Sequence, residues 1–160
     1  MARKQRGLTL IEFLVVFAIM STLLGLAVPN FSRYIVSSKS NGAADLIHQD
    51  LNYARYHAMR NTSGALYLTV QDNALCLSTL ASPSGVNACD VRKDALPSPT
   101  VLQMTDASNN ALAVAQLSFD GVHGAPSQSV TFIATTSSGA NTRVKKVTIN
   151  LIGLIATVAS

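Results

Sequence analysis

The longest apolar run of the chain lies near its N-terminal end. Residues 8–28 read LTLIEFLVVFAIMSTLLGLAV, 21 residues in which Glu12 is the one ionisable side chain. A helix of that length crosses a hydrocarbon core of about 30 Å. Residues 1–7 carry three basic side chains and no acid, so the positive-inside rule keeps them in the cytoplasm and places residues 29–160 outside it. The pattern predicts a single-pass anchor, because a secretory signal has a shorter apolar core and a small-x-small cleavage site.

The pattern changes after Pro29, which lies where the apolar run ends. Spacings of three and four residues now separate the apolar positions, which are Ala44, Ile47, Leu51, Ala54 and Ala58. This spacing predicts a helix with one buried face, and Asn61-Thr62-Ser63-Gly64 predicts its end. Joined to the apolar run, the helix would extend from about residue 8 to residue 60, on the order of 80 Å. The stretch SSKSNG at 37–42 is poor in helix formers and predicts a local bend or break.

Beyond residue 64 the pattern is one of short β-type runs separated by turn signals. A tight hairpin at Ile152-Gly153 is predicted to join the last two runs. Antiparallel strands beside an amphipathic helix make an α+β head domain. The predicted strands are Ala65–Val70, Ala74–Ser78, Thr100–Met104, Val114–Phe119, Ser129–Thr135, Val144–Leu151 and Leu154–Val158.

Composition narrows the class of protein. The chain has 160 residues, of which 48% are hydrophobic and 12% are charged, with a formal net charge of +4. The apolar content excludes a disordered chain, and two cysteines exclude a disulfide-dense mini-protein. One long apolar run also excludes a polytopic membrane protein.

Glu12 is the single glutamate of the chain, and it lies five residues into the apolar run. An acid at membrane depth costs roughly 2.5–3.5 kcal/mol on insertion scales, so it usually marks a function and has a partner. Two interpretations stay open from the residues alone. Glu12 either reaches back to the headgroups, or it pairs with a positive group that is present only on assembly.

Residues 1–29 resemble the processing signal of type IV pilins and of the pseudopilins of type II secretion. The resemblance rests on the basic leader, on Gly7-Leu8-Thr9-Leu10-Ile11-Glu12 and on Pro29 at the twenty-second position after Gly7. It implies cleavage between Gly7 and Leu8 by a prepilin peptidase, followed by N-methylation of Leu8. It also implies that Glu12 neutralises the Leu8 amine of a neighbouring subunit, a pair tolerable together in an apolar bundle and costly apart. Leu8 departs from the phenylalanine that most members have there.

Cleavage at that position would remove three basic side chains and with them most of the net charge. Residues 1–7 form the leader, residues 8–28 the transmembrane and filament-core helix, residues 29–61 its amphipathic second half, and residues 62–160 the β-rich head. The remaining 153 residues hold 9 basic and 8 acidic side chains. The positive balance is therefore mostly a topology signal for a bacterial inner-membrane protein with a periplasmic head.

Cys76 and Cys89 flank a loop rich in proline, serine and glycine. A head outside the cytoplasm favours a disulfide between them, worth about 3 kcal/mol in the loop-entropy model, over two free buried thiols. His48 and His57 lie nine residues apart on the predicted helix, so they cannot bind one metal ion from a single turn. We expect them to be surface or boundary histidines. We expect no zinc site and no other metal site.

The resemblance extends into the head. The segment ADLIHQDLNYARYHAMRN, residues 44–61, is similar to the signature helix of GspH/FimT minor pilins and pseudopilins, with Leu51, Ala54, Arg55 and Ala58 in its pattern. Val147-Thr148-Ile149 followed by Gly153 resembles the closing hairpin of that subfamily. The resemblance implies the type IV pilin fold, with the long helix packed on two small antiparallel sheets. It also implies a structural subunit that helps to initiate or cap a filament together with other major and minor pilins.

Three functions follow from this resemblance. The first is a minor type IV pilin, in a pilus that serves twitching, adhesion or DNA uptake. The second is a minor pseudopilin of a type II secretion system. The third is DNA binding, which some members perform through a Gly-Arg-x-Arg motif where this chain has Gly153-Leu154-Ile155-Ala156.

Both arginines of that DNA-binding motif are missing here, and the local basic side chains are Arg143, Lys145 and Lys146. These three could contact phosphates, but a solvated strand guarded by lysines is the favoured interpretation. We find no nucleophile elbow, phosphate loop or zinc signature, and we expect no enzyme activity and no cofactor.

Overall fold

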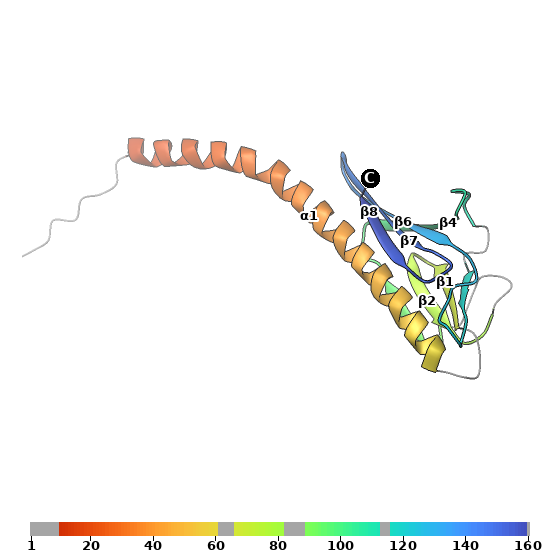
Figure 1. Ribbon diagram of the computed structural model, residues 1–160. Coiled ribbons are helices and arrows are strands. Elements are labelled where there is room, and N and C mark those ends of the chain that lie inside the picture. The colour runs from red at the N-terminus through yellow and green to blue at the C-terminus, as the bar shows by residue number, and fades with distance from the viewer. Residues whose placement is uncertain (1–9, 61–65, 82–88, 113–115, 160) are drawn as a thin grey trace, which may run out of the picture. The chain divides into compact units, whose positions relative to one another are not determined.

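The computed structural model describes residues 10–60, 66–81, 89–112 and 116–159, with the side chains of Pro29 and Ala159 left aside. Helix α1 runs from Leu10 to Arg60 (Figure 1). It ends where the predicted stop begins. Among the described residues, eight strands follow it: β1 (Leu66–Gln71), β2 (Ala74–Ser78), β3 (Arg92–Ala95), β4 (Thr100–Asp106), β5 (Gln116–Phe119), β6 (Val130–Ser138), β7 (Asn141–Ile149) and β8 (Ile155–Ala159).

The strands form two antiparallel sheets of four strands each. Sheet A has the order β3-β2-β1-β5, and sheet B has the order β4-β6-β7-β8. Both sheets lie against the second half of α1, drawn in orange to yellow in Figure 1. This arrangement confirms the predicted α+β fold of a helix packed on two small antiparallel sheets.

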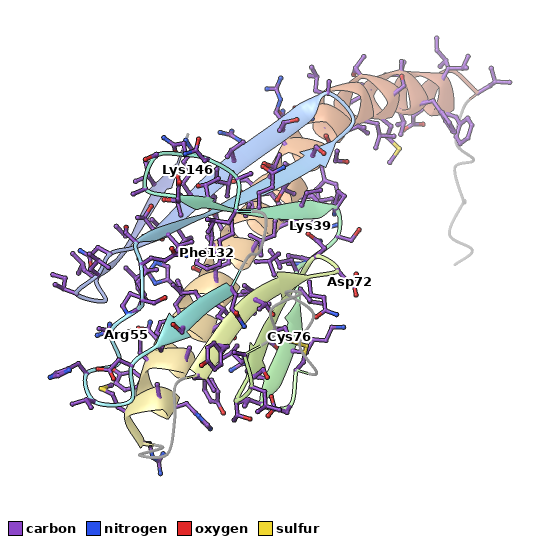
Figure 2. The ribbon with its side chains drawn as sticks, turned by 90° about the vertical axis from the view of Figure 1, so that its right-hand side faces the viewer. Lys39, Arg55, Asp72, Cys76, Phe132 and Lys146 are labelled. Carbon is purple, nitrogen blue, oxygen red and sulfur yellow. A yellow bond between two sulfur atoms is a disulfide. The ribbon has the colours of Figure 1, made fainter. Side chains whose placement is uncertain are left out.

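The apolar stripe of the helix is the centre of the core. Ala44, Ile47, Leu51, Ala54 and Ala58 are all buried, as the spacing predicts. They share one cluster with inward-facing side chains of both sheets, which include Leu68, Leu77, Leu117, Phe119, Phe132, Val147 and Ile149. Figure 2 labels Phe132 among the side chains gathered between sheet B and the helix.

The predicted break at 37–42 is not there, because α1 continues without interruption through these residues. Ser40 and Ala43 are buried, and the small side chains allow close approach between the helix and the head. Tertiary packing thus overrides the weak helix propensity of serine, asparagine and glycine in this stretch.

Contact density divides the chain into two compact units, residues 1–35 and 36–160. The second unit contains the stripe of α1 together with all eight strands. The amphipathic part of the helix therefore belongs to the same compact unit as the β-rich segment.

Two features of the strands differ from the sequence expectation. Strand β3 was not predicted, because Arg92-Lys93-Asp94-Ala95 has no β-type pattern; it pairs with β2, with Lys93 opposite Cys76. The last hairpin has a three-residue loop rather than a two-residue turn. Asn150 donates its N–H to Leu154 O at 3.1 Å, and Gly153 has a positive φ of 79°. Such a loop needs a glycine at its left-handed position.

Candidate functional site

The assembly segment predicted at the N-terminus is only partly described. Gly7 and Leu8 lie outside the described residues, so the structure bears on neither the cleavage position nor the methylated residue. Glu12 lies in the first turn of α1 and is exposed, and Pro29 lies within the helix, which continues beyond it. In sequence the nearest basic side chains to Glu12 are Arg6 and Arg33. Arg33 is 21 residues further along the helix, about 30 Å at 1.5 Å per residue.

The helix around Glu12 exposes apolar side chains on every side. Every large apolar residue from Leu10 to Val28 is exposed, at 48–78% of its surface. A helix that is apolar all round belongs in a membrane or inside an assembly of other helices. α1 is the helix, among the described residues, that is long and apolar enough to cross a membrane.

Arg55 of the signature helix ties two distant turns to α1. Its Nη1 donates to Gly153 O at 2.6 Å, and its Nε donates to Gly124 O at 3.3 Å. Gly153 belongs to the loop between β7 and β8, and Gly124 to the turn between β5 and β6. Arg55 is labelled in Figure 2 beside these loops. A bond from a charged donor is worth roughly 1.5–3 kcal/mol, so Arg55 holds both turns in place.

A side chain at either of these two glycines would force Arg55 or its neighbours to shift. A Cβ on Gly153 would lie 2.7 Å from Arg55 Cζ, and one on Gly124 would lie 3.0 Å from Arg55 O. Both glycines also have positive φ values. Arg55 and Gly153, which both belong to the subfamily resemblance, are therefore in direct contact. Their spacing in the sequence could not show this.

Cys76 and Cys89 form a disulfide. Cys76 is buried in β2, the strand between β1 and β3, and Cys89 precedes β3. The bond therefore closes the segment that leads from β2 to the edge strand β3. Figure 2 labels Cys76 within sheet A.

The three basic residues of β7 do not form one patch. Lys145 pairs with Ala134 and Arg143 pairs with Thr136, on the face of sheet B that also carries the buried Val147 and Ile149. Lys146 is on the opposite face, because successive side chains of a strand point to opposite sides. Figure 2 labels Lys146 on this strand. The structure thus places two of the predicted phosphate contacts on one face and the third on the other.

A polar groove lies between α1 and the last two strands. It is lined by Asn41, Ala44, Asp45, His48 and Gln49 of the helix, by Lys145 of β7 and by Thr157 of β8. His48 Nε2 lies 2.7 Å from Thr157 Oγ1. His48 and His57 are both half-buried, at the boundary of the head as expected, and they do not share a site.

The sequence analysis missed a buried acid on the helix. Asp50 is fully buried, and Arg92 Nε of β3 lies 3.3 Å from its Oδ1. Arg92 also pairs with Asp94, and its guanidinium lies 5.3 Å from the centre of the Tyr53 ring. Burial, followed by the neighbouring Asp94 carboxyl, raises the pKa of Asp50 to about 7. The signal was present, since Asp50 falls between Ile47 and Ala54 on the buried stripe.

The described residues contain no group of three or more His, Cys, Asp or Glu side chains that could hold a metal ion. The apolar first half of α1 is exposed, Arg55 holds the hairpin between β7 and β8, and the disulfide closes the segment that leads to the edge strand β3. These are features of a subunit that is built into an assembly.

Comparison with known proteins gives the family. The family model for the prokaryotic N-terminal methylation motif matches residues 2–28, and the model for type II transport protein GspH matches residues 43–153. The crystal structure of the type IV minor pilin FimU from Pseudomonas aeruginosa has the same fold. Its TM-score is 0.56 at 21% identity, over 78% of this chain and 94% of that one. No curated protein matches.

The GspH match covers more than half of the chain, and it contains the signature helix, the disulfide and every strand from β1 to β7, whereas β8 lies beyond it. The methylation motif covers the apolar helix that precedes it. The chain therefore belongs to the GspH family of minor pilins and pseudopilins.

Proposed function

We propose that this protein is a minor type IV pilin, a structural subunit that helps to initiate or cap pilus assembly. The observation that carries the proposal is the exposed apolar helix with its single acid, on a chain that matches the N-terminal methylation motif. A surface of that kind is stable only in lipid or among other helices, and filament assembly supplies both in turn. The fold shared with the minor pilin FimU supports the same role.

In this proposal the chain starts as a single-pass protein of the bacterial inner membrane with its head in the periplasm. Prepilin peptidase cleaves between Gly7 and Leu8, and Leu8 is then methylated on its amine. Glu12 pairs with the Leu8 amine of a neighbouring pilin when residues 8–28 enter the filament core. The nearest basic side chain after Glu12 in the sequence is Arg33, which supports a partner from another chain.

The test is Glu12→Ala in the full chain, expressed in its own host. We expect leader cleavage to remain and the protein to disappear from sheared filaments, because the incoming amine then has no counter-charge in the apolar core. Glu12→Gln keeps the shape of the side chain and removes its charge, so this variant should also be missing from sheared filaments. Normal incorporation of either variant contradicts the role of Glu12.

A second candidate is a minor pseudopilin of a type II secretion system, which the GspH description of the matching family model favours. The two candidates differ in what is lost on deletion. Loss of surface pili with normal protein secretion supports the pilin. Loss of protein secretion with normal pili supports the pseudopilin.

A further inference from the structure

The outer edge of β8 differs from the other three sheet edges. On β5, residues 125–127 cover the edge, with Phe119 bridged to Pro126 and Ser127 N–H donating to Ser118 O at 2.8 Å. On β4, Leu112 N–H donates to Met104 O at 3.0 Å. β3 carries three charged side chains in four residues. Proteins usually protect strand edges by such covering or by charge.

On β8, His48 of α1 contacts the Thr157 side chain, but among the described residues no segment is hydrogen-bonded to the outer edge and no charged side chain guards it. The sequence of β8, Ile155-Ala-Thr-Val-Ala, contains no charge and no proline, and the strand pairs with β7 on one side only. The loop before it adds exposed apolar side chains, with Leu151, Ile152 and Leu154 exposed at 60%, 78% and 63%. An uncharged, exposed strand edge beside apolar side chains is a template for pairing with another strand.

The hydrogen bonding of the hairpin shows which groups are free. Asn150 and Leu154 are a hydrogen-bonded pair, and such pairs alternate with non-bonded ones along an antiparallel ladder. Counting from that pair, Ala156 and Val158 bond to β7, opposite Thr148 and Lys146. Ile155 and Thr157 therefore direct their backbone N–H and C=O groups away from β7.

The charges around β8 indicate the partner. Residues 121–160 contain Arg143, Lys145 and Lys146 and no acidic residue, and α1 adds one acid, Asp45, which lines the groove beside Lys145 and Thr157. Lys145 and Lys146 point to opposite faces of sheet B, which does not suit a phosphate backbone running along one surface. It suits a β-strand, whose side chains alternate between the two faces, so that an acid on either face has a lysine of β7 on the same face, with β8 between them.

We propose that the outer edge of β8 is a docking site for an extended strand of a neighbouring pilin subunit, one that carries acidic side chains. The strand adds to sheet B through the free backbone groups of Ile155 and Thr157. Lys145 and Lys146 select its charge, and the apolar loop at 151–154 packs against its flank. Arg55 positions this loop through its bond to Gly153 O. The proposal rests on the proposed function, because the partner is another subunit of the filament.

The test is photocrosslinking in assembled filaments of the full chain. Val158, which is 58% exposed, is replaced by p-benzoylphenylalanine, and Val122 in the turn after β5 is the control position. We expect a crosslink from position 158 to a β-strand of another pilin, identified by mass spectrometry of the joined peptides. Position 122 should give none to that strand.

Two substitutions of Thr157 make the test specific for strand addition. Thr157→Pro removes an outward N–H and leaves the bonds to β7, so it should lower the crosslink yield about fivefold or more. Thr157→Ala removes the contact with His48 and keeps the N–H, so it should change the yield by less than about twofold. Equal yields from the two variants contradict the proposal.

Charge reversal is independent of the proline and of its effect on folding. Lys145→Glu with Lys146→Glu should lower the yield at position 158 severalfold, whereas Lys93→Glu on β3 should not. A crosslink to DNA or lipid, or no crosslink at all while the wild-type chain is present in sheared filaments, overturns the docking site alone. Absence of the wild-type chain from filaments of either kind contradicts the proposed function instead.

Discussion

The two halves of α1 have the same backbone structure and opposite surroundings. From Leu10 to Val28 its large apolar side chains are exposed on all sides, whereas from Val36 to Ala58 one face is buried under two sheets. Different surroundings stabilise the two halves as helix. The second half is stabilised by the head of its own chain, and the first half depends on lipid or on other helices.

Apolar content does not by itself define a core. The first half is richer in large apolar residues, and it contributes nothing to the buried cluster of the described head. The second half contributes four alanines of its apolar stripe together with Ile47 and Leu51, because their spacing puts them on one face. The alanines are Ala43, Ala44, Ala54 and Ala58. Stability should therefore depend on the second half of α1 and its cover, and be insensitive to the first half.

The largest effect is expected from a side chain of the core. Phe132→Ala removes a fully buried ring and should lower the free energy of unfolding of the head by about 3–5 kcal/mol. Leu14→Ala, in the exposed half of α1, should change it by less than about 0.5 kcal/mol. Urea unfolding of the full chain in detergent, followed by near-ultraviolet circular dichroism, measures both. A large loss of stability in Leu14→Ala would contradict the inference that the first half of α1 does not stabilise the head.

The next effect is a pH dependence that belongs to the head. The pKa of Asp50 is raised to about 7 from an ordinary value of 3.8, so the folded state holds this proton more tightly than the unfolded state. Its contribution to stability is complete below about pH 4 and is lost as the pH rises to about 7. Between pH 5 and pH 7 the loss is roughly 2–3 kcal/mol at 1.4 kcal/mol per pKa unit.

Asp50→Asn is the variant that checks this assignment. The amide is neutral at every pH, so the urea midpoint of the variant should stay nearly flat between pH 5 and pH 7 while that of the wild type falls. Asp45→Asn, at an exposed position of the same helix, is the control and should keep the wild-type slope. A slope that persists in Asp50→Asn shows that another group is responsible.

The smallest effect concerns the two turns that Arg55 holds. Arg55→Met should cost about 1–3 kcal/mol through the loss of two hydrogen bonds, and Gly153→Ala should cost a similar amount because its Cβ meets the guanidinium. The double variant should cost less than the two single costs added together, since the clash disappears with the arginine. Additive costs in a double-mutant cycle contradict the coupling.

Much of the fold could be predicted from periodicity, because burial repeats with the geometry of each element. The stripe from Ala44 to Ala58 has helical spacing, and β2 matches its predicted range. β3 could not be predicted, since its polar residues form a strand only because β2 lies beside them. The same holds for the break expected at 37–42, where packing of Ser40 and Ala43 decides the outcome.

The candidate site divides in a similar way. Glu12 stands out in any apolar run, and Arg55 and Gly153 were visible as parts of a motif. Their bond to each other was not visible, because 98 residues separate them. The division of Lys145 and Lys146 between two faces follows from strand geometry once β7 is known. The position of Asp50 on the apolar stripe indicated burial, but its partner Arg92 was not visible, because β3 has no strand pattern.

The contacts of Arg55 also have a consequence for the order of folding. Its partners lie 69 and 98 residues further along the chain, and His48 meets Thr157 across 109 residues. The part of the helix stripe that sheet B covers therefore stays exposed until β7 and β8 have been synthesised. Contacts so distant in sequence form slowly, and a chain cut off before β7 would leave the stripe exposed to proteases and to chaperones.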